Sequence, residues 1–292
     1  MELYQLEQFK AAAELSHITK AAELLSISQP ALSKNIRILE HELGYPLFDH
    51  VGKHVQLNEN GRVLLKYVNE IFCSLENAKR ELKELNENQE VLVSFCVKAA
   101  SKLIPEILQD YSNLHPKTRF SISQFDGSLK EANRYDLIIS ASLKPAHTPD
   151  SCTLLEEALL LALPASHPLA RENDVELSAL KDEPFISLQK GMGLSDIMDY
   201  YCQLAGFSPV IAFEGDSPST LRNLIHLGLG VAFIPELTWP DMQDQKIRLL
   251  PIRGLQCRRY INLCWDSRRY LSRAVLSFKD YLIEYFRSLR KA

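Results

Sequence analysis

The sequence lacks the features that mark several common classes of protein. It has no apolar run near the roughly 20 residues of a membrane span, and it begins with a charged amphipathic segment, so we expect neither a membrane anchor nor a secretory leader. Its six cysteines are scattered and form no C-x-x-C pair, which favours a reducing cytoplasm and thiols that act as small buried hydrophobes. Cys257 and Cys264 flank one predicted strand and leave a redox switch as the less favoured alternative.

Catalytic and cofactor motifs are also missing. There is no G-x-S-x-G elbow, no P-loop, no H-E-x-x-H and no paired Cys/His spacing, and the eight histidines are dispersed along the chain. We therefore expect no enzyme, no metal site and no cofactor. His167, in a His-Pro-Leu turn, is expected to be a surface residue.

The positive charge that often marks DNA-binding proteins is missing too. The formal net charge is −4, and residues 1–58 hold five Lys or Arg against seven Asp or Glu. The placement of the cations nevertheless favours DNA, because they cluster on one predicted helix and the hairpin that follows it. We give more weight to the placement of these cations than to the net charge of residues 1–58.

Residues 16–57 carry the pattern of a winged helix-turn-helix. A helix over Leu3–Leu15 supports a short helix from Thr19, a turn at residues 26–28, and a helix over Gln29–Leu43 with Ser28 as its N-cap. One stripe of this last helix is apolar, and its opposite face holds Gln29, Ser33, Lys34 and Arg37 without a carboxylate until Glu40. Such a face can meet base edges and phosphates in the major groove.

The next helix, expected from residue 58 or 60 to about 86, carries a heptad-like pattern. Its apolar residues alternate by four and three: Leu64, Val68, Ile71, Leu75, Ala78, Leu82 and Leu85. This spacing predicts a dimer seam, and packing against its own domain is the alternative. The polar run at residues 86–90 then marks the best domain boundary.

From residue 91 the chain alternates strands and helices. Strands are expected at Val91–Val97, residues 119–125 and residues 136–140, with helices at residues 103–114 and near residue 129. A second set comprises strands at Pro184–Leu188, residues 210–213 and residues 231–234, helices at residues 195–204 and 219–227, and a final helix at residues 270–289. Extended segments at residues 154–163 and 259–265 join the two sets. The pattern predicts largely parallel sheets in two halves around a cleft.

The turns that follow three of these strands are the candidate ligand sites, since ligands of open α/β sheets lie beyond the carboxyl ends of strands. Glycines allow close approach to the backbone, and lysines favour a small organic anion near helix N-termini. The candidate effector-binding residues are Lys98, Ala100, Ser101, Gly127, Ser128, Lys190, Gly191, Met192 and Gly193.

A family resemblance adds to these observations. The run AAELLSISQPALSKNIRILEHELGYPLF, followed by GKHVQLNENG, resembles the N-terminal signature of the LysR-type transcriptional regulators. The segments PASHPL and GLGVAFIPE resemble later landmarks of the same family, although Asp49 and His50 stand where it usually has Glu-Arg. The resemblance implies an α+β chain with a winged helix-turn-helix (1–58), a dimerising linker helix (59–90) and a two-lobed, periplasmic-binding-protein-like effector domain (91–292). The first lobe would comprise about 91–161 with 267–292, and the second about 162–266.

The function we predict is that of a cytoplasmic transcriptional regulator of this type. It would bind a double-stranded DNA operator as a homodimer through the linker helix, or as a homotetramer, and respond to a small-molecule effector. The alternative is a small-molecule binding protein whose N-terminal helices serve assembly. The candidate DNA-binding residues are Thr19, Lys20, Gln29, Pro30, Ser33, Lys34, Arg37 and Lys53.

Overall fold

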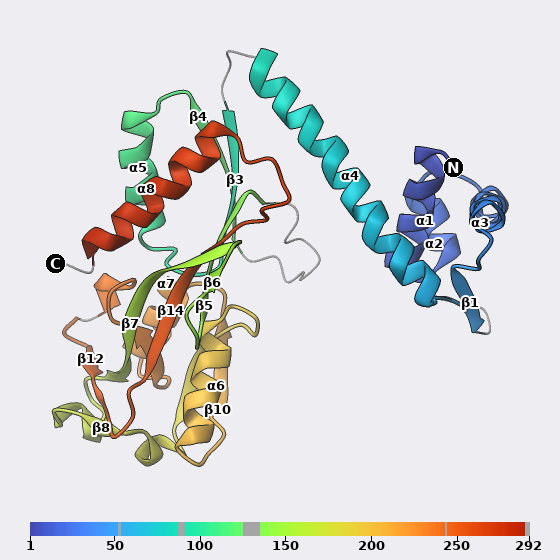
Figure 1. Cartoon of the computed structure of the whole chain (residues 1–292). Helices are drawn as coiled ribbons and strands as arrows, with labels where there is room; N and C mark the ends of the chain where they lie inside the picture. The colour runs from blue at the N-terminus through green and yellow to red at the C-terminus, as the bar shows by residue number, and fades with distance from the viewer. Residues whose placement is uncertain (52–53, 87–90, 125–134, 243, 290–292) are drawn as a thin grey trace. The chain divides into compact units, whose positions relative to one another are not determined.

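The computed structural model describes residues 1–51, 54–86, 91–124, 135–242 and 244–289 (Figure 1). The chain divides into two compact units. The first comprises residues 1–86 with 268–270, and the second comprises residues 87–267 with 271–292. No helix in the described part of the chain is long and apolar enough to cross a membrane.

The first unit opens with three short helices and a two-stranded wing. Helices α1 (Leu3–Leu15), α2 (Ile18–Leu24) and α3 (Gln29–Leu43) precede strands β1 (Phe48–Val51) and β2 (His54–Leu57), which pair antiparallel. These elements confirm the predicted winged helix-turn-helix. The second helix starts one residue before the predicted Thr19, because Nδ1 of His17 accepts a hydrogen bond from the backbone N–H of Lys20 and caps the helix.

Both predicted ends of α3 are confirmed. The hydroxyl of Ser28 accepts a hydrogen bond from the N–H of Ala31, and Gly44 ends the helix at φ 78°, a left-handed conformation that glycine adopts without strain. Between these ends, the stripe formed by Leu32, Ile36 and Leu39 is buried in the core of the unit. That burial fixes the opposite face of α3 toward solvent.

The long helix α4 (Glu59–Asn86) differs from the predicted seam over its first turns. Val68 is fully buried and Leu64 is partly buried, and both pack into the core of their own unit with Phe72. Val68, being fully buried, has no surface left for a partner helix. The exposed apolar stripe of α4 is formed instead by Val63, Tyr67, Ile71, Leu75, Leu82 and Leu85.

Residues 268–270 belong to the first unit because they are hydrogen-bonded to α4. The Asn77 side chain donates to the carbonyl of Arg268 (2.6 Å) and accepts from the N–H of Tyr270 (2.7 Å). The Tyr270 hydroxyl also donates to the Glu84 carboxylate (2.8 Å). The final helix therefore starts at Arg273 rather than at the predicted residue 270.

The second unit is built on a mixed sheet in the order β11-β7-β14-β5-β3-β4. Its elements follow the predicted alternation closely: β3 (Val91–Val97), α5 (Ile104–Leu114), β4 (Thr118–Gln124), β5 (Leu137–Ser142), β6 (His147–Thr148), β7 (Ser151–Pro164), β8 (Val175–Glu176), β9 (Pro184–Leu188), α6 (Leu194–Leu204), β10 (Val210–Gly215), α7 (Pro218–His226), β11 (Ala232–Pro235), β12 (Ile247–Leu250), β13 (Ile252–Arg253), β14 (Arg258–Cys264) and α8 (Arg273–Leu289). The helix predicted near residue 129 lies outside the described residues.

The pairing within this unit is parallel in part. Strand β3 pairs parallel with β4 and β5, and β9 pairs parallel with β10, as predicted. The joining strands β7 and β14 pair antiparallel with each other, and β14 also pairs antiparallel with β5. The sheet is mixed because the two strands that join the halves, β7 and β14, add antiparallel pairs to the parallel ones.

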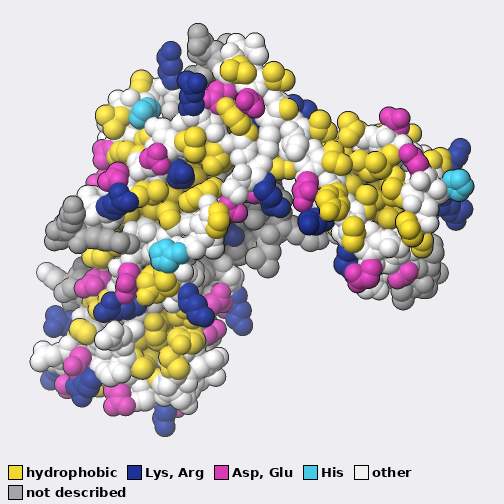
Figure 2. All heavy atoms as spheres, in the orientation of Figure 1, with side chains coloured by type: hydrophobic (Ala, Val, Ile, Leu, Met, Phe, Trp, Pro, Cys, Tyr) yellow, Lys and Arg dark blue, Asp and Glu magenta, His cyan; other side chains and the backbone are white. Residues whose placement is uncertain are grey.

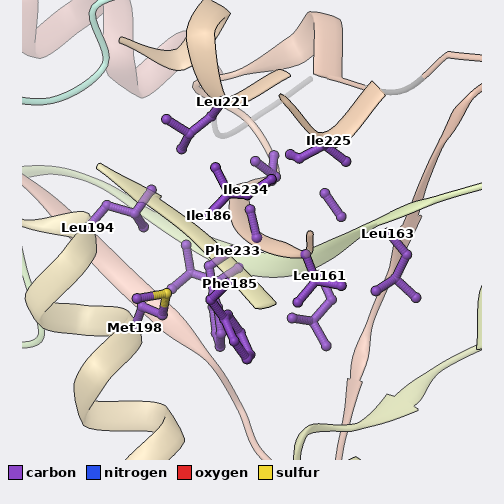
Figure 3. Packing of buried hydrophobic residues seen from close by; sticks show 14 of the residues in the cluster. Leu161, Leu163, Phe185, Ile186, Leu194, Met198, Leu221, Ile225, Phe233 and Ile234 are labelled. Carbon is purple, nitrogen blue, oxygen red and sulfur yellow. The ribbon is translucent and has the colours of Figure 1, made fainter. Parts of the chain in front are cut away.

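Two hydrophobic clusters divide this unit into lobes. The first lobe has its core among β3, β5, α5 and α8, where Phe95, Tyr111 and Phe278 pack edge to face. The second lobe has its core among β9, β11, α6 and α7, where Phe185 and Phe233 lie among aliphatic side chains (Figure 3). Strand β7 contributes to both cores, with Leu155 in the first and Leu161 in the second.

Candidate DNA-binding face and inter-lobe cavity

The solvent-facing side of α3 is a polar and cationic surface. Gln29, Lys34 and Arg37 are exposed, and the Gln29 amide donates a hydrogen bond to the Ser33 hydroxyl (3.0 Å). Figure 2 shows Lys, Arg and His side chains together at the edge of the unit where Figure 1 places α3. The same face forms a shallow depression lined by Gln29, Pro30, Ser33, Lys34, Arg37, Ile38 and His41.

Ile38 and His41 are the members of this surface that the sequence analysis did not name. They follow Lys34 at positions i+4 and i+7, so helical spacing alone places them on its face. Ile38 is exposed although it is apolar, and it offers a contact for a thymine methyl group. His41 adds two ring nitrogens at the C-terminal end of the face.

The other candidate DNA-binding residues are spread around α3. Thr19 and Lys20 are exposed on α2, and Pro30 lies in the first turn of α3, where its missing N–H leaves no bond unmade. Lys53 lies outside the described residues.

An inter-lobe cavity lies within the second unit. It is lined by Val97, Lys98, Ala99, Ala100, Ser101 and Gln124 of the first lobe, by Leu188, Met192, Asp216, Pro218 and Trp239 of the second lobe, and by Arg259 of β14. Its volume is about 20 Å³, whereas one water molecule needs about 10–15 Å³. In this arrangement the cavity has room for a water molecule but not for an organic ligand.

The cavity gathers some of the candidate effector-binding residues and not others. Lys98, Ala100, Ser101 and Met192 line it, and Ala100 has a left-handed φ of 56°, an uncommon conformation for a residue with a Cβ. Lys190, Gly191 and Gly193 do not line it. Gly127 and Ser128 lie outside the described residues.

Gly193 serves packing rather than ligand access. It has φ 74°, and a Cβ at this position would lie 3.0 Å from the carbonyl oxygen of Ala141 on β5. The glycine is therefore needed because its backbone approaches β5 closely. This contact explains its place in the sequence without a ligand.

A deeply buried ionic group, Arg259, also lines the cavity, and the sequence analysis did not name it. Its Nε donates to Oε1 of Glu157 (2.8 Å) and its Nη2 donates to the Thr238 hydroxyl (2.7 Å). Glu157 also accepts hydrogen bonds from the Thr238 hydroxyl and from the N–H groups of Leu237 and Thr238. Burial lowers the pKa of Arg259 from its usual value, and the Glu157 carboxylate opposes that shift.

The cysteines do not form the redox switch considered above. Cys257 and Cys264 are seven residues apart along an extended strand, a separation of about 23 Å at 3.3 Å per residue, far beyond disulfide distance. Burial raises the pKa of Cys202 and of Cys257 to about 12, which keeps both thiols protonated and unreactive. All six cysteines are free.

His167 is less exposed than predicted. Its Nδ1 accepts a hydrogen bond from the N–H of Leu169, and its Nε2 lies 3.3 Å from a carboxylate oxygen of Glu183. The side chain therefore holds a turn of the second lobe together. Among the described residues, no group of three or more His, Cys, Asp or Glu side chains is arranged to hold a metal ion.

A winged helix-turn-helix whose helix α3 has an exposed cationic face, in one chain with a two-lobed domain that contains a cavity, is typical of ligand-responsive DNA-binding proteins. Two family models match the chain: the bacterial regulatory helix-turn-helix of the lysR family over residues 3–62, and the LysR substrate binding domain over residues 87–287. The chain belongs to the LysR family of transcriptional regulators.

Individual relatives match this chain over nearly its whole length. It is 33% identical to the uncharacterized HTH-type regulator YybE of Bacillus subtilis, covering 98% of this chain and 99% of YybE. It is 29% identical to the transcriptional dual regulator GltC of the same organism, covering 100% and 99%. The fold matches full-length OxyR C199D from Pseudomonas aeruginosa with a TM-score of 0.60 at 23% identity, covering 98% and 95%.

This membership decides between the functions considered above. The chain is a DNA-binding transcriptional regulator with an effector-binding domain, and it is not an enzyme. The alternative in which its N-terminal helices serve assembly alone is wrong.

Proposed function

We propose that the protein binds an interrupted palindromic operator as a homodimer and changes its contacts with that DNA when a small molecule carrying an anionic group enters the inter-lobe cavity. The observation that carries the proposal is the face of α3, where Gln29, Lys34 and Arg37 are exposed together. The buried stripe on the other side of α3 holds this face toward solvent. Two copies of α3, one from each subunit, would read two half-sites of one duplex.

The exposed apolar stripe of α4 supports the dimer. Ile71 is 37% exposed and Leu75 is 38% exposed, and hydrophobic side chains gather over α1 and α4 in Figure 2. Apolar side chains that recur every three, four or seven residues on a long helix are typical of a seam between two helices. Assembly of two such dimers into a tetramer stays a prediction.

Selection of DNA from a random pool tests the proposal as a whole. The purified protein should enrich one sequence with two related half-sites, and its affinity should fall steeply with salt because phosphate contacts release counterions. A footprint over the selected site should change when the effector is added. Binding that shows no sequence preference would contradict the proposal.

Substitutions on the exposed face of α3 give a more specific test. Arg37→Ala should weaken operator binding by about 1–3 kcal/mol while leaving thermal stability unchanged, since the side chain is exposed. Lys34→Ala should reduce the salt dependence by about one ion if that lysine binds a phosphate. Both effects are measured by fluorescence anisotropy at several salt concentrations.

The matched control removes the same charge from another exposed position. Arg248→Ala, on β12 of the second unit, should leave operator affinity within about twofold of the wild type. Equal losses for Arg37→Ala and Arg248→Ala would mean that net charge, rather than the face of α3, governs binding.

A further inference from the structure

We propose that the effector is a zwitterion of the amino-acid type, with its carboxylate on Arg259 and its ammonium group on Asp216. This inference rests on the proposed function, because it assigns a chemical class of ligand to the inter-lobe cavity. Both residues line that cavity, one from the joining strand β14 and one from the second lobe.

Arg259 provides the anion-binding group. The residue is 2% exposed and lines the cavity, and two of its nitrogens are used by Glu157 and Thr238. Its third nitrogen, Nη1, has no hydrogen-bond partner among the described residues, and it is not one of their fully buried atoms, so solvent reaches it. A ligand carboxylate can replace that solvent with a charge-assisted hydrogen bond.

The buried ionic pair needs such an explanation. A buried Arg–Glu pair is often no more stabilising than apolar side chains of the same volume, so stability alone gives little reason for charge at this position. The Glu157–Thr238 network fixes the guanidinium in one orientation, and it leaves Nη1 of this cavity-lining residue without a partner among the described residues. The arrangement is that of a preorganised anion site.

Asp216 provides the complementary group. It is exposed, lines the same cavity, and makes no hydrogen bond or ion pair with any residue that the structure describes. It directly precedes Ser217, the N-cap of the nine-residue helix α7, whose N-terminus stabilises a negative charge. An ionised carboxylate at this place repels a simple anion and attracts an ammonium group.

The described side chains around the cavity carry charges of both signs. Among the described lining residues the ionisable ones are Lys98, Asp216 and Arg259, and Arg259 is paired with Glu157. A ligand with two negative charges would bring one of them near Asp216, whereas a zwitterion offers a charge of opposite sign to both Arg259 and Asp216. Ser101 and Gln124 add a hydroxyl and an amide from the first lobe.

Isothermal titration calorimetry on the purified full-length protein tests the inference. The twenty common L-amino acids are titrated one at a time, and the tightest is compared with two analogues, one without its amino group and one without its carboxylate. We expect each analogue to bind at least about tenfold more weakly than the amino acid, because each loses one charge-assisted contact.

Two variants assign the contacts. Asp216→Asn should weaken binding of the amino acid about tenfold. The variant should then bind the amino acid no more tightly than it binds the analogue without the amino group. Arg259→Lys keeps a cation for Glu157 but removes the planar fork, so it should weaken both ligands. Asp182→Asn, a change of the same kind at an exposed residue that does not line the cavity, should leave both affinities unchanged.

The possible results separate this inference from the proposed function. The zwitterion is ruled out if no amino acid binds, or if Asp216→Asn leaves the preference for the amino group intact. If only a simple carboxylate binds through Arg259 and changes the footprint, the proposed function is supported and the inference of a zwitterionic effector is wrong. Loss of sequence-selective DNA binding would overturn the proposed function, while the calorimetric preference for an amino acid would be unaffected.

Discussion

Glu157→Ala is expected to lower the free energy of unfolding of the second unit by about 3–5 kcal/mol, the usual effect of removing one partner from a buried ion pair. The substitution leaves the buried Arg259 guanidinium without its counter-charge. It also leaves two backbone N–H groups, those of Leu237 and Thr238, without their acceptor. Urea denaturation followed by tryptophan fluorescence measures this unit alone, because both tryptophans, Trp239 and Trp265, belong to it.

The neighbouring residue provides the control. Glu156 pairs with Arg258 (2.7 Å) on the same two strands, but these side chains are 39% and 50% exposed. Glu156→Ala should therefore cost about 0–1 kcal/mol. Equal losses for the two alanine variants would show that the buried network contributes no more than a surface pair. Replacing both buried partners, in Glu157→Leu with Arg259→Met, should recover much of the lost stability.

Leu75→Lys is expected to abolish the dimer and, with it, tight operator binding. A lysine in the middle of the exposed stripe of α4 would bring a charge into an apolar interface, where it has no counter-charge to pair with. Because Leu75 is already 38% exposed within one chain, the subunit itself should stay folded. Sedimentation velocity reports the assembly state, and anisotropy reports operator affinity.

A second helical leucine of matched exposure gives the comparison. Leu276 on α8 is 40% exposed, so Leu276→Lys introduces the same charge at a similar surface position outside the stripe. This variant should remain dimeric. A Leu75→Lys protein that sediments like the wild type would show that the stripe does not form the dimer.

The sequence predicted the winged helix-turn-helix well because its signals are local. Ser28, Pro30 and Gly44 bound α3 by cap and turn chemistry, and the spacing of Leu32, Ile36 and Leu39 determines which face is buried. The same reasoning failed on α4. Leu64 and Val68 fit a heptad as well as they fit packing against the unit's own core, and only tertiary contacts decide between the two.

The inter-lobe cavity was harder to predict because its members come from distant parts of the chain. Glycine turns drew attention to Gly193, whose backbone packs against Ala141, and away from Asp216. One signal was available for the buried network: Glu157 follows Glu156 in β7 and Arg259 follows Arg258 in β14, and because neighbouring strand residues point to opposite faces, one charge of each pair lies on the inner face. Nothing in their spacing indicates that they pair across the β7–β14 ladder at one register position.

The small volume of the inter-lobe cavity has a kinetic consequence. If a ligand can enter only the fraction of molecules whose lobes are apart, the apparent dissociation constant equals the intrinsic one divided by that fraction. The observed association rate then levels off at high ligand concentration, at the rate of lobe opening. A substitution at the lobe boundary that increases the open fraction would raise the apparent affinity for the effector without altering any residue that contacts it. Sensitivity to the effector and selectivity among ligands can therefore change independently in this protein.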